Sequence, residues 1–253
     1  MTFVVSVAGK GGVGKTTFSA LVVRHLHDTT GEVVLAVDAD PNSNLAAKLG
    51  TEPGRTVGDL REEIIQRGEE PPRGVSKQEY IDYQIKLALK DGNGFDLIAM
   101  GRQEGPGCYC YVNNMLRTFI DSIAEKYSYV VIDNEAGMEH LSRRTTRSSD
   151  VLFVLCDRSK ASLDAAKRIA ALADEMMIRV RRKALVFNSL DPDSQIPQAS
   201  EVQDFKATYG VRRSTLIQAK MTQTESLLDI PKTDPMFVDV IKAVDSERMA
   251  LRA

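Results

Sequence analysis

The chain has 253 residues, of which 43 % are hydrophobic and 27 % charged, and its formal net charge at pH 7 is −2. This length suffices for one large core, so we expect a single domain over residues 1–253. Because the positive and negative charges nearly cancel, the net charge gives no reason to expect nucleic acid or a membrane surface as a partner. Three cysteines exclude a disulfide scaffold. Without a recognisable signal peptide or a membrane-spanning run, a cytoplasmic location is expected.

The first predicted strand, Phe3 to Val7, leads into a glycine-rich segment and then into a helical pattern. Gly9 to Thr16 has the spacing G-x-x-x-x-G-K-T of a phosphate-binding P-loop. Glycines let the backbone N–H groups converge on a polyphosphate, while Lys15 would reach the β- and γ-phosphates and Thr16 would face Mg²⁺. The helix is expected to begin at Thr17, with its positive end toward the anion. The predicted nucleotide-binding residues are Gly11, Gly12, Val13, Gly14, Lys15, Thr16 and Thr17.

A second lysine, Lys10, stands at the start of this loop and extends the pattern to K-G-G-x-G-K-T. The extended pattern resembles that of the deviant P-loop ATPases, which include Min-type and ParA-type ATPases and the nitrogenase iron protein. The resemblance implies a nucleotide-sandwich homodimer in which Lys10 reaches the phosphates bound to the partner subunit. In the helix that follows, His25 and His27 are expected on the outer side, in contact with solvent.

A second apolar run, Val33 to Val37, predicts a strand that ends at Asp38 and Asp40. Carboxylates at the carboxyl ends of parallel strands face the crevice in which open α/β sheets bind ligands. One of them can hold a Mg²⁺-bound water and the other can orient the attacking water. An aspartate that caps the next helix would explain one of the two, but hardly both. Similarity to the deviant group assigns Asp38 to the Mg²⁺ shell and Asp40 to the hydrolytic water.

The middle of the chain is less informative. Residues 51–75 are polar and rich in glycine and proline, which predicts a loop-rich excursion around one short helix. Apolar residues four apart predict an amphipathic helix over 77–90. Phe95 to Met100 then predicts a strand.

Cys108 and Cys110 follow that strand, shortly before another predicted helix. Thiols one residue apart can together ligate a soft or borderline metal, and a nearby helix N-terminus favours their thiolate forms. A tetrahedral thiolate site needs four sulfurs, and a two-fold dimer would supply the missing pair. Alternatively, both cysteines are small hydrophobes in a packed turn, and spacing alone does not decide. Cys156 lies inside the apolar run Val151 to Cys156 and is expected to be buried in a strand.

The strand predicted over Tyr129 to Ile132 ends at Asp133. An aspartate at this place in a P-loop protein is positioned to hold Mg²⁺ through water. The Ala136–Gly137 pair behind it allows the backbone to approach the γ-phosphate and to move when that group leaves. We therefore interpret residues 133–141 as the segment that responds to the state of the nucleotide.

The C-terminal part supports the fold more than the chemistry. The predicted elements are a helix over Ala161 to Met176, a strand over Ala184 to Phe187, a short edge strand over Ser214 to Gln218 and a last helix around Phe237 to Val244. Alternating strands and helices predict a P-loop NTPase fold, with a mostly parallel twisted sheet flanked by helices on both faces. By resemblance to related ATPases, Asn188 reads the adenine edge; a strand-terminating asparagine is the alternative.

Together these motifs resemble the CooC-type ATPases that mature nickel enzymes. The resemblance is carried by the Lys10 P-loop, the strand end at Asp38 and Asp40, the Cys-x-Cys segment and Asp133 through Leu141. It implies a dimer that binds Ni²⁺, or Zn²⁺ in competition, through four thiolates and uses ATP and Mg²⁺ to deliver nickel. The implied client is a nickel enzyme such as carbon monoxide dehydrogenase or acetyl-CoA synthase.

Two alternatives stay open. A Min- or ParA-type spatial switch would dock on a membrane or on DNA, with structural cysteines; we find neither a membrane-binding tail nor a basic DNA face in the sequence. An electron-transfer ATPase would hold an iron–sulfur cluster between the same four thiolates. Nitrogenase-type iron proteins carry a single cysteine near the switch segment, whereas residues 133–150 contain none.

Overall fold

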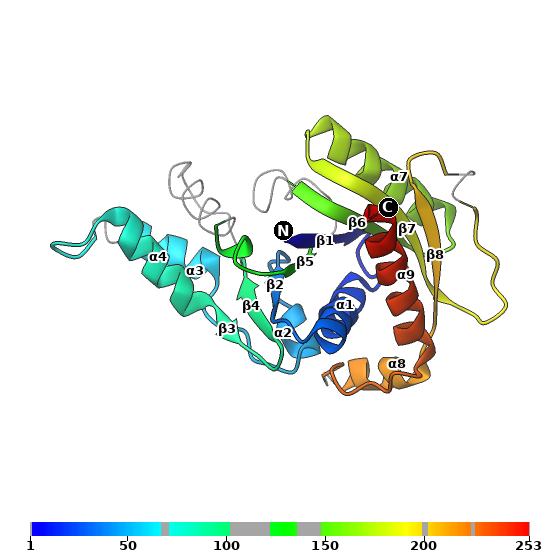
Figure 1. The fold of residues 1–253 in the computed structure, drawn as a ribbon, viewed down its shortest axis with the longest axis horizontal. Helices are drawn as coiled ribbons and strands as arrows, with labels where there is room; N and C mark the ends of the chain where they lie inside the picture. Colours follow the sequence, from blue (N-terminus) through cyan, green and yellow to red (C-terminus); the bar gives the residue numbers. More distant parts are fainter. Residues whose placement is uncertain are drawn as a thin grey trace.

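A computed structural model of the chain describes residues 2–66, 71–101, 122–135, 148–198, 202–223 and 226–252. Its strands form an eight-stranded sheet in the order β3-β4-β2-β5-β1-β6-β7-β8 (Figure 1). Every strand pair is parallel except β3–β4. The predicted mostly parallel sheet is confirmed, whereas the antiparallel edge strand β3 was not predicted.

The strands are β1 (Phe3–Gly9), β2 (Val34–Asp38), β3 (Lys90–Asp91), β4 (Phe95–Ala99), β5 (Tyr129–Asp133), β6 (Ser148–Cys156), β7 (Arg179–Leu190) and β8 (Ala207–Arg212). The helices in the described ranges are α1 (Lys15–Thr30), α2 (Leu45–Lys48), α3 (Val57–Gln66), α4 (Lys77–Ala88), α7 (Lys160–Glu175), α8 (Thr215–Thr222) and α9 (Pro235–Arg252). None of these helices has the length and apolar character that crossing a bilayer requires.

The alternating side chains of the central strand β1 divide the core into two layers. Val5 and Val7 pack on one face with α1 and α9, whereas Val4 and Ala8 point to the other. On that other face, α3 and α4 cover the β4–β2–β5 half and α7 covers the β6–β7 half (Figure 1). Helices therefore flank the sheet on both faces, as predicted from the alternating pattern.

Helix α1 begins at Lys15, two residues before the predicted start, and ends before Gly31, whose φ of 71° closes its last turn. One prediction about this helix is wrong. His25 is not solvated: it is 2 % exposed, and its Nε2 lies 2.9 Å from Asp245 Oδ1 of α9. The sequence of α1 alone does not reveal that α9 packs against this side of the helix.

The predicted edge strand over Ser214 to Gln218 is also wrong. The edge strand is β8, and Ser214 instead caps α8, because its Oγ accepts a hydrogen bond of 3.1 Å from the N–H of Ile217. A serine hydroxyl that satisfies a free amide favours a helix start at this position over a short strand. The residues from Gln218 to Met221 consequently lie on a helix.

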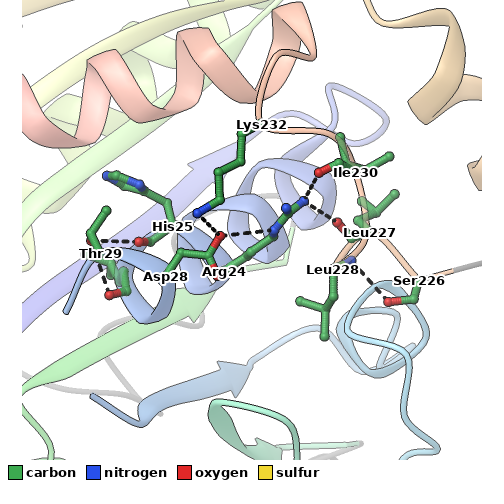
Figure 2. Close-up of polar contacts among 10 residues, drawn as sticks. Arg24, His25, Asp28, Thr29, Ser226, Leu227, Leu228, Ile230 and Lys232 are labelled. Atoms are coloured by element: carbon green, nitrogen blue, oxygen red, sulfur yellow. Dashed lines mark hydrogen bonds and ion pairs between the residues drawn. The ribbon is translucent and has the colours of Figure 1, made fainter. Parts of the chain in front are cut away.

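The nearly buried Arg24 of α1 forms hydrogen bonds with the loop over residues 226–230, which follows α8 (Figure 2). The Nη1 of Arg24 donates to the carbonyl of Leu227 at 3.4 Å and to that of Ile230. Its guanidinium carbon also lies 4.5 Å from the centre of the Phe237 ring on α9. The N–H of Leu227 in turn donates to the carbonyl of Lys48 at 2.9 Å. Arg24 thereby connects the P-loop helix with the 226–230 loop, and through that loop with α2.

We expect Arg24→Met to lower the free energy of unfolding by about 2–3 kcal/mol, because the carbonyls of Leu227 and Ile230 lose a charged donor. Urea denaturation measures this loss. Arg24 also pairs with Asp28, whose Oδ2 lies 3.6 Å from Arg24 Nε and 3.2 Å from Lys232 Nζ (Figure 2). The matched control is therefore Lys232→Met, which removes a 68 % exposed cation from the same carboxylate and should cost less than about 1 kcal/mol. Equal losses in the two variants would contradict the proposed role of Arg24.

Candidate functional site

The P-loop leaves the sheet at the carboxyl end of β1. Because β1 lies between β5 and β6, the strand order changes direction here, and open α/β sheets bind ligands at such a point. Gly14, which precedes α1, has a φ of 90°. A Cβ atom at this residue would lie 2.4 Å from Asn188 Nδ2, so both the backbone conformation and the close contact require glycine.

A pocket of about 450 Å³ lies at this edge of the sheet. Its lining comes from the P-loop, from the segment that follows β2, from the residue two positions beyond β5 and from α8. The lining residues are Gly11, Gly12, Gly14, Lys15, Thr16, Thr17, Asp40, Asn42, Asn44, Ala47, Lys48, Glu135 and Met221. The fold thus brings most of the predicted P-loop residues together with Asp40.

Several lining residues were not predicted. Asn42 and Asn44 lie two and four residues after Asp40, and their position beyond a strand end was a usable signal. Lys48 and Met221 gave no local signal, because they reach the pocket from α2 and α8 through tertiary packing. The hydroxyl of Thr17 lies 3.4 Å from Met221 Sδ, which brings α8 against the start of α1.

Lys15 is buried, and its Nζ donates to the carbonyl of Lys10 at 3.2 Å. Burial lowers the pKa of Lys15, while the carboxylates of Asp133, Asp40 and Glu135 act in the opposite direction. The ammonium therefore lies between the loop backbone and an acidic group of residues. The side chain of Lys10 itself is exposed.

Asp133 closes β5 and lies between the ends of β1 and β2, because it pairs in register with Val7 and with Asp38. Its Oδ1 accepts a hydrogen bond of 2.9 Å from Ser19 Oγ, whereas its buried Oδ2 has no hydrogen-bond partner among the described residues. Burial raises the pKa of Asp133 to about 6, although the hydroxyls of Thr16 and Ser19 lower it. A buried carboxylate oxygen without a partner, close to a threonine hydroxyl, is a donor set that fits Mg²⁺.

Asp38 is completely buried, and both of its oxygens are occupied. Oδ1 accepts the N–H of Asp40 at 3.1 Å and Oδ2 accepts the N–H of Leu45 at 2.8 Å. Burial, with the charge of Asp133, raises the pKa of Asp38 to about 7. Asp38 thus holds the loop that carries Asp40 and fixes the start of α2. This matches the alternative that one of the two aspartates, Asp38 or Asp40, caps the next helix. Its role in the Mg²⁺ shell stays a prediction.

Asn188 lies at an irregular point of β7, where the register with β8 shifts between Phe187 and Leu190. Its Nδ2 donates to the carbonyl of Val13 at 2.8 Å, so the side chain supports the P-loop from the neighbouring part of the sheet. Its buried Oδ1 has no hydrogen-bond partner among the described residues and remains available as an acceptor. The adenine contact predicted for Asn188 stays a prediction.

The predicted metal ligands Cys108 and Cys110 lie outside the described residues, as do residues 136–141 of the predicted switch. Within the described ranges, no group of three or more His, Cys, Asp or Glu side chains is arranged to hold a metal ion. Cys156 is buried in β6, as predicted, and burial raises the pKa of its thiol to about 12.

Comparison with known proteins agrees with this geometry. Residues 1–186 match the family model described as an AAA domain. The chain is 47 % identical over 192 residues to an uncharacterized ATP-binding protein of Methanocaldococcus jannaschii, covering 75 % of this chain and 76 % of that protein. It is 32 % identical over 186 residues to the carbon monoxide dehydrogenase accessory protein CooC of Rhodospirillum rubrum, covering 69 % and 70 %.

Among solved structures, the septum site-determining protein MinD of Pyrococcus horikoshii OT3, complexed with Mg-ADP, aligns with a TM-score of 0.68 over 99 % of both chains. The identity is 17 %, so this likeness concerns the fold alone. The family match covers the strand, loop and helix that form the pocket as well as β2 and β5. This chain belongs to the AAA domain family and is a deviant P-loop ATPase with a MinD-like fold.

Proposed function

We propose that this protein is a homodimeric ATPase metallochaperone that binds Ni²⁺ through Cys108 and Cys110 of both subunits and transfers it to a nickel enzyme. The observation that carries the proposal is this Cys-x-Cys pair in a chain 32 % identical to a carbon monoxide dehydrogenase accessory protein. Carbon monoxide dehydrogenase or acetyl-CoA synthase is the proposed client. A reducing compartment such as the cytoplasm would keep the four thiols available as ligands.

For the ATP reaction, the proposed roles follow from the pocket. The P-loop amides and Lys15 hold the phosphates, and Asp40 on the pocket wall orients the attacking water. Thr16 and Asp133 would hold Mg²⁺, which neutralises charge on the β- and γ-phosphate oxygens when bound. Asp38 acts through the loop, because it accepts the N–H of Asp40.

The dimer contributes a further proposed group. Lys10 is exposed at the start of the P-loop, and only its carbonyl takes part in a contact with Lys15. Its ammonium is therefore available to a second subunit. We assign it to the phosphates bound by that partner, where it would neutralise charge in the transition state.

We expect Lys15→Ala and Lys10→Ala each to reduce ATP turnover by roughly a hundredfold or more, because each removes a cation from the reacting phosphates. Lys15→Ala should also weaken ATP binding, whereas Lys10→Ala should leave binding to the monomer nearly unchanged. Phosphate release and ATP titration separate these effects. The exposed Lys167 on α7 provides the control variant Lys167→Ala. Full turnover in both P-loop variants would refute the mechanism.

Asn188 is proposed to prefer adenine over guanine, because its free Oδ1 can accept from the adenine amino group and would repel a guanine carbonyl. We expect Asn188→Ala to weaken ATP binding by about tenfold and GTP binding by less. Competition against a fluorescent ATP analogue measures both. An equal loss for the two nucleotides would mean that Asn188 only supports the carbonyl of Val13.

The nickel site is tested by an anaerobic Ni²⁺ titration of the reduced protein, followed by thiolate-to-metal absorption and mass. We expect saturation at one metal per dimer, with the band lost when Cys108→Ala and Cys110→Ala are combined. Cys156→Ala, which removes a buried thiol of β6, should leave the band unchanged.

Two outcomes of this titration would favour the other candidates. Absence of a thiolate band in the wild-type protein would return both cysteines to a packing role and favour a spatial switch, in line with the MinD-like fold. Visible absorption before any metal is added would indicate an iron–sulfur cluster.

A further inference from the structure

Lys48, the last residue of α2, lines the nucleotide pocket together with P-loop residues. Of the described residues that line this pocket, two are cationic, Lys15 and Lys48, and two are acidic, Asp40 and Glu135. Lys15 is part of the P-loop motif. Lys48 belongs to none of the motifs identified in the sequence, and the proposed mechanism does not use it.

Lys48 is partly buried without an anionic partner among the described residues. Its side chain is partly buried, and it forms no ion pair or side-chain hydrogen bond with any described residue. Burial is the cause that lowers the pKa of Lys48. Partial burial of a cation without a counter-charge costs free energy, and an anionic ligand that enters the pocket would offset that cost.

The backbone of Lys48 is held at both ends of α2. At its start, the N–H of Leu45 donates to Asp38 Oδ2 at 2.8 Å. At its end, the carbonyl of Lys48 accepts the N–H of Leu227 at 2.9 Å, and Arg24 fixes the carbonyl of Leu227 (Figure 2). Leu49, the next residue, is 1 % exposed. The lysine therefore extends from a fixed backbone, so a contact with ligand requires ordering of the side chain but not of the main chain.

The other residues near α2 on the pocket wall do not supply a positive charge. Ala47 and Met221 are neutral, and Asn42 and Asn44 offer amides. A ligand with several negative charges, held by the P-loop, would therefore lie near Lys48, the cation that α2 contributes to the pocket wall. The polyphosphate of a nucleoside di- or triphosphate has this chemistry.

We propose that Lys48 is a second phosphate-binding lysine of this pocket, contacting the polyphosphate of the nucleotide held by its own subunit. Lys48 would thus complement Lys15 from the α2 side of the pocket and, unlike the role assigned to Lys10, would act in a single subunit. The inference rests on nucleotide binding in the proposed function and is independent of nickel.

The test measures displacement of a fluorescent ADP analogue from the full chain by ADP and by inorganic tripolyphosphate, in the presence of Mg²⁺. We expect Lys48→Met to weaken both ligands by about tenfold or more, because a charge-assisted hydrogen bond is lost. Lys48→Gln provides a second neutral replacement with a different shape and should behave in the same way. The control is Lys242→Met, which removes an exposed lysine of α9 and should change neither affinity.

Wild-type affinity for ADP in both Lys48 variants would overturn the inference and leave the proposed ATPase intact. A loss for ADP without a loss for tripolyphosphate would overturn it as well, because Lys48 would then contact the nucleoside. If the wild-type protein itself bound no nucleotide, the proposed function would fail at its first step. These results separate the two proposals.

Discussion

The nucleotide pocket depends on the insertion of β5 between β1 and β2. This pairing sets Asp133 in register with Val7 and with Asp38, so the P-loop and the loop that carries Asp40 leave the sheet beside one buried carboxylate. Burial makes an ionised Asp133 costly, and its Oδ2 has no hydrogen-bond partner among the described residues. A divalent cation would offset that cost. Binding of Mg²⁺ beside Asp133 would therefore stabilise this part of the fold.

The pocket wall formed by α2 and α8 depends on contacts between segments that are distant in the sequence. Arg24 on α1 holds the 226–230 loop (Figure 2), and the N–H of Leu227 in this loop donates to the carbonyl of Lys48. Asn188 supports the P-loop through the carbonyl of Val13. The phosphate-binding backbone is thus supported from β7, two strands away from β1 in the sheet, and the α2 side of the pocket is supported from the C-terminal part of the chain. Preorganisation of this kind reduces the entropy lost on binding.

In the proposed function, β5 connects the metal-binding segment with the proposed switch segment in chain order. Cys108 and Cys110 lie between β4 and β5, and β5 ends at Asp133, where the proposed switch segment begins. A change at the γ-phosphate that moves residues after Asp133 would therefore act on the strand that follows the cysteines in the chain. In the proposed dimer, the partner-directed Lys10 and the paired thiols would both depend on how the two subunits approach each other.

The sequence by itself determined the strand–loop–helix unit around Lys15, the acidic strand ends at Asp38 and Asp133 and the parallel sheet, because these features depend on local spacing and apolar runs. Only the tertiary structure decided the environments of His25 and Lys48. His25 is buried because α9 packs on α1, and Lys48 reaches the pocket because α2 is held at both ends. The helix at Ser214 followed from a hydroxyl cap, which outweighed a weak strand pattern. Contacts between segments far apart in the sequence leave no local periodicity, so they became visible only in the folded chain.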